Sequence, residues 1–377
     1  MKQTDIPTPY YIIYEEKLRK NLSLIDSVRK SAGVEIIMAF KANALWRTFP
    51  IFREYGFKFT ASSLNEMQLG NEYLHTKAHS YCPAYTAHTI DRFLAGSSHI
   101  TFNSLSQFAR FGAAANRAGV SAGLRVNPQC SVIETDIYNP ALPGSRFGVT
   151  AEELKNAGLP DGLDGFHFHA LCESSASDLA LVLDAFESQF GQFLPHLKWV
   201  NMGGGHLMTR DGYDVERLVE LLQGFRNRYP WLKVILEPGS AFTWRTGDLV
   251  TSVVDTVCNQ GVRTAIIDAS FACHMPDTLE MPYTPAVTES LPEAPGLIPY
   301  RLGGNSCLSG DYAGPWFFDH ELEEGEKLTL EDMNHYTTVK TNMFNGISHP
   351  AIVLEHADGE CEYLRQFDYN DYRSRMC

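Results

Sequence analysis

Short apolar runs alternate with helical stretches eight times before residue 240. The runs have the length of buried strands, and they cover residues 34–40, 57–61, 79–82, 99–102, 122–126, 163–168, 199–202 and 234–236. Between them, residues 15–30 and 214–229 repeat aliphatic side chains at spacings of three and four, which is typical of amphipathic helices. Eightfold alternation of strand and helix predicts an α/β fold of the (β/α)8 TIM-barrel type.

Polar or glycine residues directly follow seven of these eight runs. They are Lys41, Ser62, Asn103, Asn127, His169, the triplet Gly203, Gly204 and Gly205, and Glu237. A (β/α)8 barrel gathers its functional groups at the carboxyl ends of its strands. A doubly wound open sheet shares the same alternation, but it would not bring the first and eighth strands side by side.

The pattern changes after about residue 245. Residues 249–257, 264–267, 326–330 and 351–355 are expected to be strands, and prolines cluster between residues 276 and 299. We therefore expect a barrel over residues 12–245 and a mainly β domain made of residues 1–11 and 246–377. The N-terminal residues 8–13 have no role left in the barrel, and we expect them to join the β domain.

Composition excludes several classes of protein. A formal net charge of −14 argues against nucleic acid as a partner and suits a cationic substrate. Neither an apolar signal core near Met1 nor an apolar run close to 18 residues is present, so we expect a cytoplasmic protein without a membrane partner. The eight cysteines are scattered without a CxxC pair, which gives no support for a metal site.

The strand-end residues match the requirements of pyridoxal 5'-phosphate. This cofactor needs a lysine for covalent attachment, donors for its phosphate, a partner for its pyridine nitrogen and a group against its ring face. Lys41, the glycine triplet 203–205, Glu237 and His169 would supply these in that order. Each also has an ordinary interpretation: a lysine reaching solvent, a loop, a loop cap and a core histidine. The core interpretation applies more strongly to His167.

A glycine-rich stretch downstream, residues 303–311, carries a thiol and a carboxylate. Cys307 beside the cofactor would return a proton to a carbanion, and Asp311 would bind an ammonium group. A cysteine is more often a small buried hydrophobic residue.

Together these motifs resemble the alanine racemase-like (fold type III) pyridoxal phosphate decarboxylases, nearly from end to end. In that resemblance Lys41 is the attachment lysine, His169 the ring-stacking histidine, Glu237 with Gly239 the pyridinium-binding segment, and Tyr336 a phosphate contact. The family also implies that Cys307 and its neighbours come from a second subunit, so that a homodimer shares its active sites. Leu171-Cys172 departs from the Gly-Ser that ornithine and diaminopimelate decarboxylases carry after the histidine.

Within the family, the branch acting on carboxynorspermidine and carboxyspermidine is the most similar. The likeness rests above all on residues 268–277, read Asp-Ala-Ser-Phe-Ala-Cys-His-Met-Pro-Asp, and on Glu280-Met281-Pro282-Tyr283. It implies decarboxylation of a triamine that bears one amino-acid end, in polyamine and spermidine biosynthesis. Substrate contacts are then expected from Glu237, His274, Asp277, Glu280 and Asp311. Leu308 stands where diaminopimelate decarboxylase has an acidic residue, which argues against that substrate.

Three other activities stay open on the sequence. Another basic amino-acid decarboxylase of the same fold, acting on ornithine or diaminopimelate, would share most of these motifs. A racemase would favour a cationic partner at the pyridine nitrogen. Glu237 is anionic, which argues against a racemase. A non-catalytic regulatory homologue would be free to lose Lys41 and Cys307, and both are present.

Overall fold

The chain forms two compact units, one made of residues 21–242 and the other of residues 1–20 and 243–377. The computed structural model describes residues 1–133, 135–281 and 283–377, so Pro282 of the motif above lies outside the described residues. The expected domain limit at residue 12 falls inside a strand, β1 (Tyr10–Tyr14), and the observed division falls within helix α1 (Glu15–Ala32).

The first unit is the predicted barrel, a parallel sheet in the order β2-β10-β9-β8-β7-β6-β5-β4-β3. Its strands are β2 (Glu35–Ile36), β3 (Met38–Ala39), β4 (Phe59–Ala61), β5 (Ala78–Tyr81), β6 (Ser97–Phe102), β7 (Ser121–Arg125), β8 (Gly165–His167), β9 (Trp199–Asn201) and β10 (Lys233–Leu236). Each of the eight apolar runs overlaps one of them, or two in the case of the first run. The predicted fold class is confirmed.

The first run closes the sheet. Its early part, β2, pairs with β10, and its later part, β3, pairs with β4. The change occurs at Ile37, whose N–H donates to Leu236 O, while the N–H of Met38 donates to Lys58 O. One stretch of chain thus joins both ends of a nearly closed barrel.

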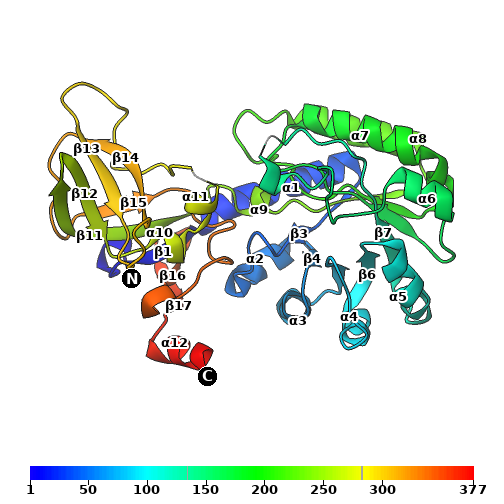
Figure 1. The fold of residues 1–377 in the computed structure, drawn as a ribbon, viewed down its shortest axis with the longest axis horizontal. Helices are drawn as coiled ribbons and strands as arrows, with labels where there is room; N and C mark the ends of the chain where they lie inside the picture. The colour runs from blue at the N-terminus through cyan, green and yellow to red at the C-terminus, as the bar shows by residue number, and fades with distance from the viewer. Residues whose placement is uncertain (134, 282) are drawn as a thin grey trace. The chain divides into compact units, whose positions relative to one another are not determined.

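Helices cover the outer side of the barrel sheet, where α3, α4 and α5 pack along β4 to β7 (Figure 1). The helices of this unit are α2 (Phe49–Glu54), α3 (Leu64–Tyr73), α4 (Ile90–Gly96), α5 (Leu105–Arg117), α6 (Ala151–Ala157), α7 (Ala176–Phe190), α8 (Val215–Arg228) and α9 (Ser240–Thr243), with α1 and α9 spanning its ends. The predicted helix at 214–229 is α8, which begins after Asp214, whose side chain accepts from Arg217 N at 2.9 Å.

The second unit is a mixed sheet in the order β14-β13-β12-β11-β1-β16-β17, with β15 paired to β11. Its remaining strands are β11 (Gly247–Asn259), β12 (Val262–Ile267), β13 (Ile298–Gly303), β14 (Tyr312–Phe318), β15 (Lys327–Leu330), β16 (Ala351–Glu355) and β17 (Cys361–Arg365). Short helices α10 (Phe271–His274), α11 (Asp277–Glu280) and α12 (Tyr369–Met376) complete it. Here β1 pairs with β11 and β16, as expected for the N-terminal segment.

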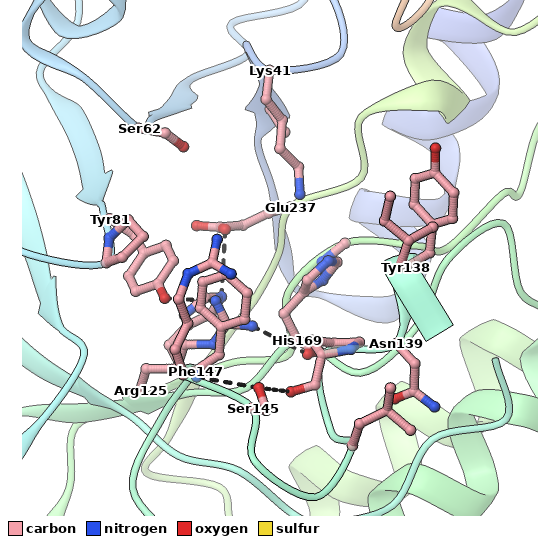
Figure 2. Close-up of a pocket in the computed structure, with 18 of the residues that line it drawn as sticks. Lys41, Ser62, Tyr81, Arg125, Tyr138, Asn139, Ser145, Phe147, His169 and Glu237 are labelled. Carbon is pink, nitrogen blue, oxygen red and sulfur yellow. Dashed lines mark hydrogen bonds and ion pairs between the residues drawn. The ribbon is translucent and has the colours of Figure 1, made fainter. Parts of the chain in front are cut away.

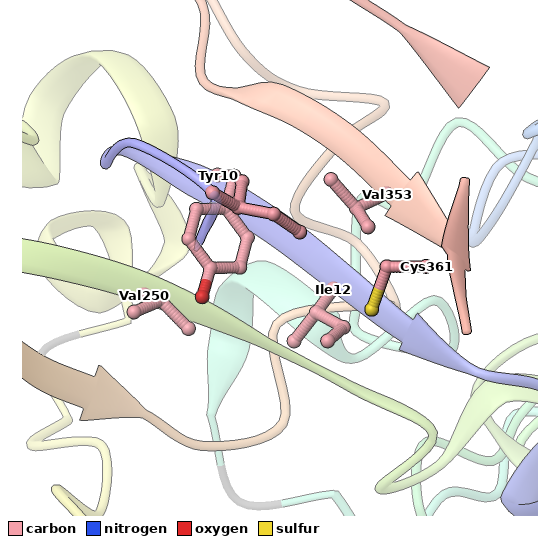
Figure 3. Close-up of a cluster of buried hydrophobic side chains, with 6 residues drawn as sticks. Tyr10, Ile12, Val250, Val353 and Cys361 are labelled. Atoms are coloured by element: carbon pink, nitrogen blue, oxygen red, sulfur yellow. The ribbon is translucent and has the colours of Figure 1, made fainter. Parts of the chain in front are cut away.

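A buried cluster holds β1 within this sheet. Tyr10 and Ile12 of β1 pack with Val250 of β11, Val353 of β16 and Cys361 of β17 (Figure 3). Ile12 and Val353 are completely buried. The first residues of the chain therefore supply part of the core of the second unit, although most of that unit lies more than 200 residues later in the sequence.

Candidate active site

A cavity of about 770 Å³ opens at the carboxyl ends of the barrel strands. Strand-end residues line it in nearly every sector: Lys41 after β3, Ser62 after β4, Tyr81 of β5, Arg125 of β7, His167 of β8, His169 beyond it, Gly204 after β9 and Glu237 after β10. Parallel strands of a barrel direct all their ends to one rim. Of the strand-end residues singled out in the sequence, Lys41, Ser62, His169, Gly204 and Glu237 line this cavity, whereas Asn103, Asn127, Gly203 and Gly205 are not among its lining residues.

Lys41 extends into the cavity above Glu237 (Figure 2). The residue before it, Phe40, is buried and stacks on Phe49 and Phe59, with ring centroids 4.9 and 4.5 Å apart, which fixes the chain where the lysine begins. The Lys41 side chain is exposed to the open cavity, although its amine lies among protein atoms of the cavity wall. Burial, followed by the positive charge of Arg125, lowers the pKa of the Lys41 amine, which favours the neutral nucleophile.

Glu237 is held by the neighbouring strands. Asn201 Nδ2 donates to Glu237 Oε1 at 2.6 Å, and His167 Nε2 lies 3.6 Å from Oε2. Burial raises the pKa of the Glu237 carboxyl, whereas the hydrogen bond from Asn201 and the positive charge of Lys41 oppose that rise. A buried carboxylate of this kind is suited to bind a protonated ring nitrogen.

His169 is fixed by the glycine triplet. The N–H of Gly204 donates to His169 Nδ1 at 3.0 Å, so the proton of the neutral ring is on Nε2. Burial, with Lys41 and Arg125, lowers the pKa of His169 well below its ordinary value, which agrees with a neutral ring. The ring is thus held in one orientation at the cavity wall.

The glycine triplet packs tightly against the strand ends. Gly203 has a positive φ of 71°, and a Cβ there would lie 2.4 Å from Phe168 O, so only glycine fits. Its N–H donates to Asn201 Oδ1 at 2.9 Å, and the N–H of Gly204 is taken by His169. Protein acceptors therefore already use two amides of the triplet, and phosphate binding by these residues stays a prediction.

Arg125 and Tyr81 are site residues that the sequence did not reveal. Arg125 is 4% exposed, donates to Tyr81 Oη at 2.7 Å, and has its guanidinium 4.4 Å from the centre of the Phe147 ring. Burial lowers the pKa of the guanidinium, and the contacts with Tyr81 counteract this. The sequence did offer one signal, because Arg125 stands near the end of an otherwise apolar run. Burying a charged side chain costs free energy, so a buried arginine is rarely there by chance.

The loop between β7 and α6 forms one wall of the cavity. The lining residues on it lie between residues 136 and 147 and include the short helix η3 (Asp136–Tyr138). Asn103 Nδ2 donates to Arg146 O at 2.8 Å, and Asn127 Nδ2 donates to Phe147 O at 3.3 Å. These two strand-end asparagines anchor the loop.

Asp311, a predicted ammonium ligand, is buried in the second unit. Its carboxylate accepts hydrogen bonds from Ser270 Oγ at 2.8 Å and Ala272 N at 2.9 Å, and from the N–H and hydroxyl of Ser306. It is 4% exposed. These contacts connect the glycine-rich loop to α10, a structural role that the sequence did not indicate.

The other predicted substrate residues lie near α10 and α11. Asp277 and Glu280 both form ion pairs with Lys340. Burial lowers the pKa of the Lys340 ammonium, but the hydrogen bonds to the two carboxylates outweigh this effect and raise it. His274 is completely buried, and its Nδ1 accepts from Ser270 N at 3.1 Å. The acidic pair thus already binds one ammonium group, while His274 lies in the core.

Cys307 and Tyr336 both lie in the second unit. Cys307 is exposed, and its N–H donates to Asn345 Oδ1 at 2.8 Å. Tyr336 has a backbone φ of 51°, a value that residues other than glycine rarely adopt. Their predicted contacts with cofactor stay predictions, as does the role of Gly239, which lies directly after Glu237 in the barrel unit.

Across residues 1–133, 135–281 and 283–377, no group of three or more His, Cys, Asp or Glu side chains is arranged to hold a metal ion. The same ranges contain no helix of a length and apolarity that would cross a membrane.

The residues of the cavity fit pyridoxal phosphate. A lysine with a lowered pKa, an oriented neutral histidine and a carboxylate anchored by an amide converge on one cavity, and the described residues that line it all belong to the barrel unit. The group would be held by Lys41, His169 and Glu237, and it would supply an acceptor for the electrons of a carbanion.

Comparison with known proteins gives the same result. The family model described as pyridoxal-dependent decarboxylase, C-terminal sheet domain, matches residues 22–334. A carboxyaminopropylagmatine decarboxylase of Synechocystis sp. is 43% identical, over 99% of this chain and 96% of its own length. A carboxynorspermidine/carboxyspermidine decarboxylase of Campylobacter jejuni is 41% identical, over 98% of both.

Solved structures extend the likeness to the fold. The crystal structure of carboxynorspermidine decarboxylase from C. jejuni, complexed with norspermidine, superposes with a TM-score of 0.90 at 40% identity and covers 98% of this chain and 100% of its own. A diaminopimelate decarboxylase from Helicobacter pylori, at 18% identity and a TM-score of 0.82, shares the fold. The resemblance inferred from the sequence motifs is confirmed.

Proposed function

The chain belongs to the pyridoxal-dependent decarboxylase family, and we propose that its substrate is a carboxylated triamine, carboxynorspermidine or carboxyspermidine. The observation that supports decarboxylation best is the convergence of Lys41, His169 and Glu237 in one cavity. The substrate class is supported by the near full-length similarity to the C. jejuni enzyme. We further propose that the enzyme works in the cytoplasm as a homodimer.

When bound, pyridoxal phosphate accepts the electron pair left on the α-carbon as carbon dioxide departs. Lys41 would hold the group, and its lowered pKa favours the neutral amine that attachment and exchange with the substrate amine would require. Glu237 would hold a proton at the ring nitrogen, and Asn201 keeps that carboxylate in position. Cys307 is the proposed donor of a proton to the α-carbon.

The distal ammonium groups of the substrate need anionic partners. We assign this role to Asp277 and Glu280, an acidic pair whose geometry suits an ammonium group, and the substrate would have to replace Lys340 as their partner. Asp311 uses its carboxylate for loop contacts, and its substrate role has no such support. The same holds for His274, which is buried.

A second candidate substrate is carboxyaminopropylagmatine. The Synechocystis relative that acts on it is 43% identical over nearly the whole chain, a value similar to that of the carboxynorspermidine enzyme. The two classes differ at the distal end, where one has an ammonium group and the other a guanidinium.

A decarboxylation assay with five substrates tests the proposal. Carboxynorspermidine or carboxyspermidine should exceed ornithine and diaminopimelate in kcat/KM by about a hundredfold or more, the value of two charge-assisted contacts of about 1.5–3 kcal/mol each. Carboxyaminopropylagmatine is the fifth substrate. If the enzyme prefers carboxyaminopropylagmatine to both triamines, the second candidate replaces our assignment. If it uses ornithine as well as it uses the triamines, only the general assignment as a decarboxylase is left.

The variant Asp277→Asn should weaken use of the triamine selectively. Losing one ammonium contact worth about 1.5–3 kcal/mol lowers kcat/KM for the triamine roughly tenfold to a hundredfold. Cofactor content and the rate with ornithine should stay unchanged. The exposed Asp255→Asn serves as the matched control, and an equal loss with both substrates would assign Asp277 a structural role.

Mixing two inactive variants tests the shared active site. If Lys41 and Cys307 act together across a homodimer, the Lys41→Ala and Cys307→Ala proteins should regain activity after subunit exchange. A mixed dimer contains one site with both residues intact. Subunit exchange shown by mass spectrometry, without recovery of activity, would mean that both residues act within one chain.

A further inference from the structure

His167 is a buried polar side chain that has no hydrogen-bond partner among the described residues. It is 3% exposed at the end of β8, and within the described part of the chain neither of its ring nitrogens has a hydrogen-bond partner. An unsatisfied buried polar group costs about 1–3 kcal/mol, and such groups are uncommon in folded proteins. The sequence pattern favoured a core histidine here, but the side chain lines the cavity.

The ring of His167 is next to Oε2 of Glu237, a carboxyl group that also interacts with the side chain of Thr60. Asn201 satisfies Glu237 Oε1 at 2.6 Å, and Oε2 faces His167 Nε2 at 3.6 Å. This separation is too long for a hydrogen bond, and a shift of about 0.5 Å would bring it into range. Such contacts often tighten when an active site is loaded.

We propose that His167 is a positioning residue for Glu237, whose Oε2 accepts a hydrogen bond from His167 Nε2–H in the enzyme that holds its cofactor. Asn201 and His167 would then hold the carboxylate from both sides. The inference rests on the proposed function, because it gives Glu237 the ring nitrogen as its partner.

The charges around His167 favour a neutral donor. Burial, then Arg125 and Lys41, lower the pKa of the imidazole well below its ordinary value. Tyr81, His169 and Glu237 are the other titratable groups near it on the cavity wall. A neutral ring donates one hydrogen bond without adding a positive charge, so the negative charge of Glu237 remains available to the ring nitrogen.

Two substitutions separate positioning from packing. His167→Phe keeps an aromatic ring but removes the donor, and His167→Gln places an amide N–H close to the position of Nε2. Without the donor, the Glu237 carboxyl is protonated at a higher pH, because hydrogen bonds to the charged form favour it. The phenylalanine variant should thus lose cofactor affinity at a higher pH than the wild type, and the glutamine variant should restore the wild-type behaviour.

The measurement is the dissociation constant of pyridoxal phosphate across pH 5–8, with kcat and KM measured on the loaded enzymes. We expect the acid limb of binding in His167→Phe to move up by about one pH unit, with kcat roughly tenfold lower and KM little changed. An unchanged acid limb, or a glutamine variant that behaves as the phenylalanine variant does, would overturn the proposal.

Separate control experiments test folding and the choice of substrate. Thermal melting shows whether each variant is folded, and His167→Leu replaces His167→Phe if the latter is not. The binding measurement needs no substrate. A wild-type enzyme that binds the cofactor but ignores the triamines therefore refutes the proposed substrate alone, and leaves the result for His167 in force.

Discussion

Lys41→Ala should yield a folded protein that no longer retains pyridoxal phosphate after borohydride reduction, and whose turnover is at least about 10³-fold lower. The lysine extends into the cavity with a lowered pKa, which makes it the amine suited to covalent attachment. Phe40, which fixes the chain before it, is untouched by the substitution. Mass spectrometry of peptides from the reduced wild type should place the adduct on residue 41.

The control is Lys77→Ala, an exposed lysine of the same unit. It should keep both adduct and activity. An adduct found on a peptide without residue 41 would contradict the assignment, and a Lys41→Ala protein that fails to melt cooperatively would show a structural effect instead.

Glu237→Gln should separate turnover from cofactor binding. The amide has the shape of the carboxylate but cannot hold a proton on the ring nitrogen by charge, so kcat should fall on the order of a hundredfold. Cofactor content should change far less, because Lys41 and His169 are still in place. Absorbance of the bound cofactor and steady-state decarboxylation measure the two effects.

Glu187→Gln provides the comparison for this variant, since that glutamate pairs with Arg228 on the helical layer and should leave kcat unchanged. A loss below roughly tenfold for Glu237→Gln, about 1.4 kcal/mol of barrier, would mean that the carboxylate does not tune the ring.

Much of the barrel was predictable because most of its strands are short and rich in apolar residues, and are buried on both faces. Each run therefore stands out from the amphipathic helices between them, and topology then places the strand ends together. Strands β13, β14 and β17 were not predicted. Pro299 lies within β13, and Gly314-Pro315 lies within β14, so both sequences resemble loops.

The chemistry of single residues was predictable where a motif marks it, as at Lys41 and Glu237. Partnerships between strands were not. The pairing of Arg125 with Tyr81 joins β7 to β5, and no spacing in the sequence reports it. Asp311 shows the same limit, because a carboxylate in a glycine-rich loop has the same sequence signal whether it binds substrate or Ser270.

The loop over residues 136–147 suggests how this enzyme could diversify. Asn103 and Asn127 hold it through backbone carbonyl groups, which every amino acid possesses. Mutations in the loop can therefore alter one wall of the cavity while its attachment and the strand-end chemistry are preserved. The shape of the cavity can thus change between relatives by exchange of this segment alone, without any change in Lys41, His169 or Glu237.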